Sequence, residues 1–157
     1  MSENNYSTSV TPSKVWLPKV SDCNTIFEFM VRQFPRIEAA IWHQRFIDGK
    51  VLDETGKQFS LETPYAGDRH IIYYREVPFE EPVPFEEKII FQNENFLIVD
   101  KPHFLPVHPA GKYVNETLVN RLKSKHGFKD IVTAHRLDRL TAGLILCILK
   151  QEVRGQY

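Results

Sequence analysis

Apolar residues recur with two different spacings along the first half of the chain. Asn24 is suited to cap a helix whose apolar residues lie three or four positions apart, namely Ile26, Phe29, Met30 and Phe34. Pro35 interrupts that pattern and can open a second helix, because the first turn tolerates a missing N–H. We expect the second helix to run to about Phe46.

The residues that follow favour turns and extended chain. Asp48-Gly49 suits a tight hairpin turn, and Thr55-Gly56 suits a second turn. The run Ile-Ile-Tyr-Tyr at residues 71–74 predicts a closing strand. Together these elements predict a small α+β domain over residues 15–76. The polar residues 1–14, rich in Ser, Asn and Thr, predict a disordered tail.

Residues 77–87 differ in composition from the segments on either side. Prolines alternate with glutamates here, and proline removes backbone donors and favours extended chain. We therefore expect a stiff acidic linker rather than a packed element, and we place the domain boundary at it.

Residues 88–157 predict a second domain. Four strands are expected, at residues 88–91, 96–100, 131–133 and 144–149. The first two are joined at Asn93-Glu94-Asn95, and the dense apolar run in the second predicts a strand buried on both faces. A helix is expected from about Glu116 to Lys125, and Gly127 stops it.

Charge is distributed unevenly along a chain whose formal net charge is zero. Residues 101–157 carry ten Lys and Arg against four Asp and Glu, whereas residues 1–100 carry ten against sixteen. Such asymmetry is typical of a segment that binds a polyanion. An unevenly charged solvated surface explains it equally well, so charge alone leaves the two interpretations level.

The cysteines and the apolar runs indicate the compartment. Cys23 and Cys147 lie far apart, and neither belongs to a metal-binding spacing, so we expect reduced thiols and no metal. The first twenty residues lack the apolar core of a signal peptide. The longest apolar run, residues 144–149, is too short to span a bilayer. We expect a cytoplasmic protein with no membrane partner.

The segment from residue 135 to 144, His-Arg-Leu-Asp-Arg-Leu-Thr-Ala-Gly-Leu, concentrates reactive groups between two expected strands. Asp138 stands between Arg136 and Arg139, beside an imidazole and a hydroxyl. Neighbouring cations keep a carboxylate ionised as a nucleophile or base, and they also attract phosphate. A structural Arg–Asp pair that closes a loop is the simpler interpretation, and the chemistry alone favours it.

This segment resembles the signature of the RluA-type family of RNA pseudouridine synthases. In that signature His-Arg-Leu-Asp is followed by Arg, a variable residue, Thr, a small residue and Gly; Ala142 stands where serine is more usual. Residues 99–102 (Val-Asp-Lys-Pro) and 107–109 (Val-His-Pro) resemble two further family segments. Residues 15–76 are similar, more loosely, to the small ribosomal-protein-type RNA-binding domain that often precedes the catalytic domain.

The resemblance implies both a fold and a reaction. The fold is a small RNA-binding α+β domain followed by the first part of a mixed, mainly antiparallel-sheet catalytic domain. The reaction is the isomerisation of a chosen uridine in structured RNA, either rRNA or tRNA, by a monomer without metal or organic cofactor. Asp138 is the implied nucleophile, and it attacks either the sugar or the uracil ring. The target nucleotide must be flipped out of its stack to be reached.

The resemblance and the chemistry assign roles to the neighbouring residues. Arg136 is expected to fill the space left by the flipped base, because its planar cation stacks as well as hydrogen-bonds. Arg139 is interpreted as a phosphate contact or as a partner of Asp138. Lys101 and His108 are each equally well explained as site residues or as structural residues. His135 more often satisfies a loop hydrogen bond than performs acid–base chemistry.

Two weaker expectations concern supporting residues. The hydroxyl of Thr141 is expected to bond the backbone and hold the loop. In the first domain, five basic residues can line an RNA-binding face or simply a solvated helix surface: Arg32, Arg36, His43, Arg45 and Lys50.

The chain departs from the family pattern after the signature. The family carries a tyrosine on a later strand, and Tyr157 does not match it, because residues 151–157 predict the start of a helix instead. We therefore expect the chain to be a truncated, incomplete fragment of such an enzyme. A non-catalytic RNA-binding protein derived from the same family is the alternative. A hydrolase that uses a lone aspartate ranks last, because no second acid–base group accompanies it.

Overall fold

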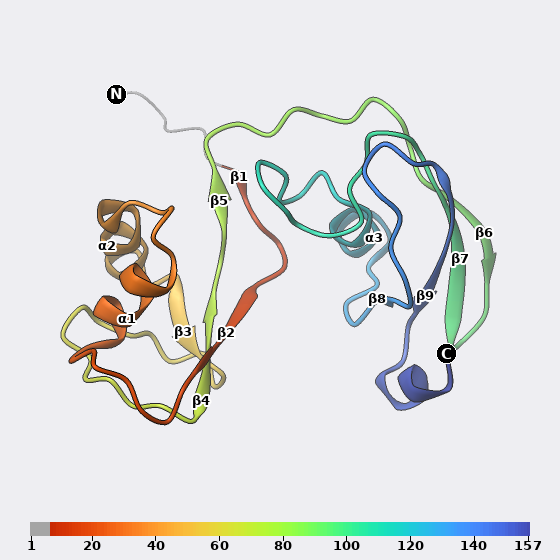
Figure 1. The fold of residues 1–157 in the computed structure, drawn as a ribbon. Coiled ribbons are helices and arrows are strands. Elements are labelled where there is room, and N and C mark those ends of the chain that lie inside the picture. The colour runs from red at the N-terminus through yellow and green to blue at the C-terminus, as the bar shows by residue number, and fades with distance from the viewer. Residues whose placement is uncertain (1–6) are drawn as a thin grey trace. The chain divides into compact units, whose positions relative to one another are not determined.

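The computed structural model describes residues 7–157, which form two compact units. One unit comprises residues 12–75, and the other comprises residues 76–157 together with the described residues before Pro12 (Figure 1). Both units combine helices with antiparallel strands, so the predicted α+β class is confirmed.

The unit of residues 12–75 packs two helices against a three-stranded sheet (Figure 1). The sheet has the order β2-β4-β3, with antiparallel pairing throughout. Its elements are β2 (Ser13–Leu17), α1 (Ile26–Gln33), α2 (Ala39–Ile47), β3 (Val51–Asp53) and β4 (Arg69–Tyr73). Helix α1 begins after Thr25 rather than Asn24. The Thr25 hydroxyl accepts from the Glu28 N–H at 3.1 Å, and the Glu28 carboxylate accepts from the Asn24 N–H at 2.8 Å.

An aromatic core explains why the second helix sits where it does. Trp42 is fully buried and lies against Phe34 and Tyr73, with ring centroids 5.4 and 5.1 Å away. The Arg45 guanidinium lies over the Trp42 ring at 4.7 Å from its centroid and is 5% exposed. Arg45 is thus buried against an aromatic ring, and the expectation that it lines an RNA-binding face is wrong.

Two local expectations in this unit are corrected. Asp48-Gly49 does not form a hairpin turn; it ends α2, since the Asp48 N–H donates to the Gln44 carbonyl at 2.8 Å. Pro35 does not open α2, which begins at Ala39. The turn at Thr55-Gly56 is present, with the Gly56 N–H donating to the Asp53 carbonyl at 3.0 Å.

The second unit is built on a four-stranded antiparallel sheet of order β6-β7-β9-β8. These strands are β6 (Lys88–Gln92), β7 (Phe96–Lys101), β8 (Val132–Thr133) and β9 (Gly143–Ile148). Helix α3 (Leu118–His126) packs against one face, and a 3-10 helix, η1 (Gln151–Gln156), follows β9. The predicted end of α3 at Gly127 is confirmed.

Strand β7 is buried on one face rather than on both. Leu97, Val99 and Lys101 are fully buried beneath α3, whereas the alternate residues Phe96 and Ile98 are only partly covered. The alternation follows from a sheet with a helix on a single side. The prediction of burial on both faces, made from the dense apolar composition of this strand, is therefore wrong.

The expected disordered tail is corrected for the residues that the structure describes. Strand β1 (Ser7–Thr8) pairs antiparallel with β5 (Glu76–Val77), and Ser9 is 2% exposed. The Asn115 amide donates to the Thr8 carbonyl at 2.8 Å and so ties these residues to the loop before α3. Residues 13 and 14 begin β2. The remainder of that prediction, residues 1–6, lies outside the described residues.

The expected linker is a packed part of the second unit, and we call residues 77–87 the strap. Val77, Val83 and Glu87 are buried in it. The Glu80 carboxylate accepts the backbone N–H groups of Val114 (2.6 Å) and Asn115 (2.8 Å). Proline removes donors from the strap, so side chains and the loop before α3 supply its polar contacts instead.

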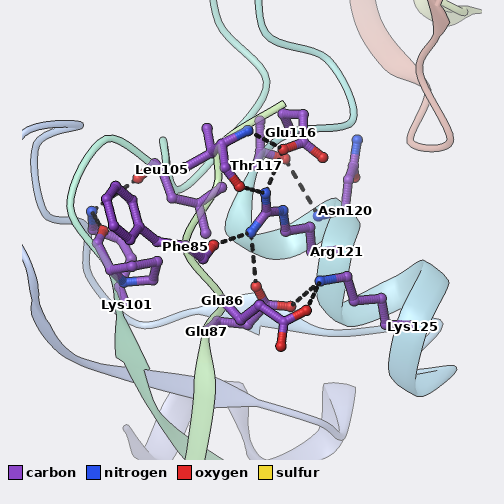
Figure 2. A network of polar contacts seen from close by, with 12 residues as sticks. Phe85, Glu86, Glu87, Lys101, Leu105, Glu116, Thr117, Asn120, Arg121 and Lys125 are labelled. Atoms are coloured by element: carbon purple, nitrogen blue, oxygen red, sulfur yellow. Dashed lines mark hydrogen bonds and ion pairs between the residues drawn. The ribbon is translucent and has the colours of Figure 1, made fainter. Parts of the chain in front are cut away.

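Arg121 of α3 is the centre of this attachment (Figure 2). Its guanidinium donates to the carbonyls of Val83 and Phe85, both at 2.7 Å, and to the Glu87 carboxylate at 3.2 Å. It also contacts the Glu116 carboxylate, which in turn accepts the Val83 N–H at 2.7 Å. Burial alone would raise the pKa of Glu116, but its hydrogen bonds from Arg121 and Val83 and the nearby cations hold that pKa below its ordinary value.

The two cysteines are buried free thiols. Burial raises the pKa of Cys147 to about 12, so this thiol is unreactive at neutral pH. Within residues 7–157, no helix has the length and apolar character needed to cross a membrane.

Arg121→Met should destabilise the second unit severely. The substitution leaves the buried Glu87 carboxylate and two strap carbonyls without their donor, and removing one partner of a buried ion pair costs about 3–5 kcal/mol. Urea unfolding of the whole chain measures the loss. Lys150→Met is the matched control, because the exposed pair between Lys150 and Glu94 contributes less than about 1 kcal/mol. Equal losses in the two variants would contradict the role assigned to Arg121.

Candidate functional site

A hollow of about 550 Å³ lies between two segments of the second unit. Residues 106–113 form one wall, and residues 136–139 form the other. The first segment connects β7 to α3, and the second connects β8 to β9. The hollow therefore gathers side chains from two loops of the same sheet, and it contains Asp138, Arg136, Arg139 and His108.

Backbone contacts hold the loop that carries Asp138. The Thr141 N–H donates to the Asp138 carbonyl at 3.0 Å, which closes a turn immediately after the carboxylate. Gly143 then enters β9 at φ +146°, a conformation that favours glycine, and a Cβ there would lie 3.3 Å from Leu137 Cδ1. Thr141 holds the loop through its backbone, and its hydroxyl makes no hydrogen bond with the described residues, contrary to expectation.

The Asp138 side chain is exposed on the wall of the hollow. It makes no hydrogen bond or ion pair with any residue from 7 to 157. The simpler interpretation, a structural Arg–Asp pair, is therefore wrong for these residues. Arg136 and Arg139 are also exposed, and they place two positive charges on the same wall of the hollow.

Arg139 contacts an aromatic ring instead of Asp138. Its guanidinium lies over the Tyr113 ring at 5.8 Å from the centroid, and the Lys112 ammonium lies 5.4 Å from the same centroid. Both distances are within the range of cation–π attraction. Of the two roles expected for Arg139, that of a partner of Asp138 is not seen within the described residues.

His108 faces Arg136 across the hollow. Its Nε2 atom lies 3.0 Å from the Thr133 hydroxyl on β8, which fixes the ring. Desolvation by the walls of the hollow, and secondly the positive charge of Arg136, lower the pKa of His108 below its ordinary value of 6.5. His108 is thus neutral at pH 7 and can accept as well as donate a hydrogen bond.

Lys101 and His135 have structural contacts. Lys101 is fully buried, and its ammonium donates to the carbonyls of Pro102 (3.0 Å) and Leu105 (2.9 Å), so it shapes the turn before the wall of the hollow (Figure 2). Burial lowers its pKa. His135 Nε2 accepts the Leu146 N–H of β9 at 3.2 Å. Neither residue lines the hollow, and the buried ammonium of Lys101 cannot contact RNA directly.

The comparisons with known proteins bear on this same region. Residues 95–152 match the model of the RNA pseudouridylate synthase family. The match begins at β7 and ends just after β9, so it includes both loops that form the hollow. It supports the resemblance to RluA-type synthases that the signature indicates.

Individual relatives agree with the family match. An uncharacterised RNA pseudouridine synthase from Synechocystis is 27% identical over 77% of this chain and 41% of its own length. A human pseudouridylate synthase is 42% identical over 35% of this chain and 10% of its own length. A tRNA pseudouridine(31) synthase from Saccharomyces cerevisiae is 37% identical over 43% of this chain and 16% of its own length. The chain spans less than half the length of each of these relatives.

The region that matches the family model contains site residues that sequence reasoning missed. Tyr113 and Lys112 line the hollow, and His103 joins the two loops because its Nδ1 atom lies 2.8 Å from the Leu140 carbonyl. The Gly-Lys-Tyr run at residues 111–113 offers only the charge of Lys112 as a signal, because the contact between Tyr113 and Arg139 spans 26 positions. No cluster of residues suited to a metal is present between residues 7 and 157.

Arg136→Gln should raise the pKa of His108. The rise should be partial, because desolvation is the larger cause and remains in the variant. The lowered pKa of His108 also makes the free energy of unfolding depend on pH. The contribution of His108 is fully present above pH 6.5 and is lost as the pH falls through the pKa of the folded state. NMR titration of the histidine ring protons measures the shift.

Lys150→Gln provides the charge-matched control for this titration. Strand β9 begins at Gly143 near the hollow, and Lys150 follows the other end of that strand. It should leave the His108 titration unchanged. If the pKa of His108 were the same in Arg136→Gln as in the wild type, the electrostatic contact across the hollow would be disproved.

Proposed function

We propose that this chain is the part of an RNA pseudouridine synthase that carries the nucleophile, Asp138, for isomerising a specific uridine in tRNA or rRNA. The observation that carries the proposal is the position of Asp138. Its exposed carboxylate has no partner among the described residues, stands in a cation-lined hollow, and lies in the segment that matches the pseudouridylate synthase family.

The proposed reaction needs a nucleophile and no redox partner. The N-glycosidic bond of the uridine breaks, the uracil turns, and a C–C bond forms to the same ribose, so no atom is lost and no redox partner is needed. A carboxylate supplies the nucleophile for either sugar or ring attack. A free carboxylate requires no ion pair to be broken before it attacks.

The hollow fits a single extruded nucleotide. Its volume of about 550 Å³ lies within the range of ligand pockets, roughly 300–1,000 Å³. A base in a stacked helix must leave the stack to reach a carboxylate on a protein wall. In this proposal Arg136, exposed beside Asp138, fills the place of the flipped base.

The cations around the hollow supply attraction for the RNA backbone. Lys112, Arg136 and Arg139 line it, His108 adds no charge at neutral pH, and Asp138 is the one acidic residue among those that line the hollow. Phosphate contacts of this kind dominate affinity for nucleic acids and weaken as salt increases. We extend the proposal to the unit of residues 12–75, where Arg32, Arg36 and His43 are exposed and form a candidate RNA-binding face.

The names of relatives suggest which RNA to test first. Two Saccharomyces cerevisiae relatives are named as tRNA pseudouridine synthases, for positions 31 and 32. We therefore propose tRNA as the first substrate class to be assayed, with rRNA as the second. Because the chain spans less than half of these relatives, the assay should include the 157-residue chain and any longer product of the same reading frame.

Tritium release from C5-labelled uridine in bulk tRNA and rRNA tests the proposed activity. Release by the wild-type protein should fall by more than about a thousandfold in Asp138→Asn, because removal of a nucleophile eliminates the chemical step. RNA binding should persist in the variant, since the substitution removes a negative charge from an exposed position.

Asp130→Asn is the matched control, because Asp130 is an exposed aspartate outside the residues that line the hollow. It should release tritium at the wild-type rate. RNA binding without release by any length of the protein would overturn the enzyme proposal and leave a non-catalytic RNA-binding protein of the same family.

A further inference from the structure

Tyr113 is placed by the backbone at the edge of the candidate site. The N–H and carbonyl of Tyr113 pair with the carbonyl and N–H of Ala110, both at 3.0 Å, around a tight turn in which Gly111 has φ +55°. The next residue, Val114, is fully buried, and its N–H is held by the Glu80 carboxylate. The ring itself is partly buried against the core of the unit. The backbone contacts and the partial burial of the ring therefore place Tyr113 at the edge of the hollow.

The ring of Tyr113 attracts the arginine that follows the proposed nucleophile. Arg139 is adjacent to Asp138 in the chain, and an exposed arginine beside a carboxylate is free to pair with it. The Arg139 guanidinium instead lies over the Tyr113 ring, 5.8 Å from its centroid. The Tyr113 hydroxyl makes no hydrogen bond with the described residues, so the contact depends on the ring face alone.

We infer that Tyr113 is a positioning residue that holds Arg139 by cation–π attraction, leaving Asp138 unpaired and the guanidinium available to an RNA phosphate. The inference rests on the proposed RNA-binding function of this site. Arginine suits both tasks at once, because the face of its planar cation stacks on an aromatic ring while its edge donates hydrogen bonds to phosphate. Tyr113 acts through Arg139 and need not touch the substrate.

A series of variants separates the ring from its hydroxyl. Tyr113→Phe keeps an aromatic face, whereas Tyr113→Leu keeps only apolar bulk. The Arg139 side-chain protons should show a ring-current shift in the wild-type chain and in Tyr113→Phe, and should lose it in Tyr113→Leu. This NMR measurement is made on the 157-residue chain without RNA, and absence of the shift in the wild type would overturn the inference.

RNA binding tests the consequence of the contact. With bulk tRNA as the probe, Tyr113→Leu should weaken binding about two- to fivefold, as expected from an exposed cation–π contact, and Tyr113→Phe should bind like the wild type. In a chain that already carries Arg139→Gln, Tyr113→Leu should have a clearly smaller effect, because only the contact between Lys112 and the ring is left to lose. Thermal melting of each variant checks that the fold is retained.

The outcomes distinguish this inference from the proposed function. Equal weakening by Tyr113→Leu with and without Arg139→Gln, or Tyr113→Phe behaving like Tyr113→Leu, would refute the positioning role. A wild-type chain that shows the ring-current shift but does not bind tRNA would support the Tyr113–Arg139 contact and would refute the proposed RNA-binding function.

Discussion

The attachment of the strap to α3 through Arg121 is the interaction on which the second unit depends. Arg121 donates to two strap carbonyls and contacts the carboxylates of Glu87 and Glu116, so its removal leaves the two carbonyls without a donor and both carboxylates without their guanidinium. The same strap carries Glu80, whose carboxylate holds the backbone just after Tyr113. A charge network away from the hollow thus fixes one of its two walls.

The other wall is held by different means. The loop with Asp138 is anchored by the turn at Thr141, by the passage of Gly143 into β9, and by His135 on the Leu146 N–H. None of these contacts uses the Asp138 carboxylate. Because backbone and neighbouring residues position the loop, the carboxylate is not needed to hold it, and the proposed function uses this freedom for the nucleophile.

Local sequence patterns predicted the positions of helices and strands better than they predicted what each segment packs against. The four strands of the second unit and the end of α3 were predicted, since each depends on residues close in sequence. The strap was not, because alternating Pro and Glu have the composition of a linker until a cation 34 positions away, Arg121, pairs with Glu87. Asp48-Gly49 illustrates the same limit, because a helix end and a hairpin turn favour the same residues.

The candidate site was likewise predictable only in its contiguous part. His135, Arg136, Asp138 and Arg139 lie in one segment, but which of them face the hollow depends on the register of β9. Tyr113 has no distinguishing pattern of its own and gains significance only beside Arg139. Two kinds of charged residue therefore divide the unit: Arg121 is buried and bonded to the strap, whereas Asp138 is exposed and its carboxylate has no contact with the described residues. This division allows the site to change without loss of the unit that carries it.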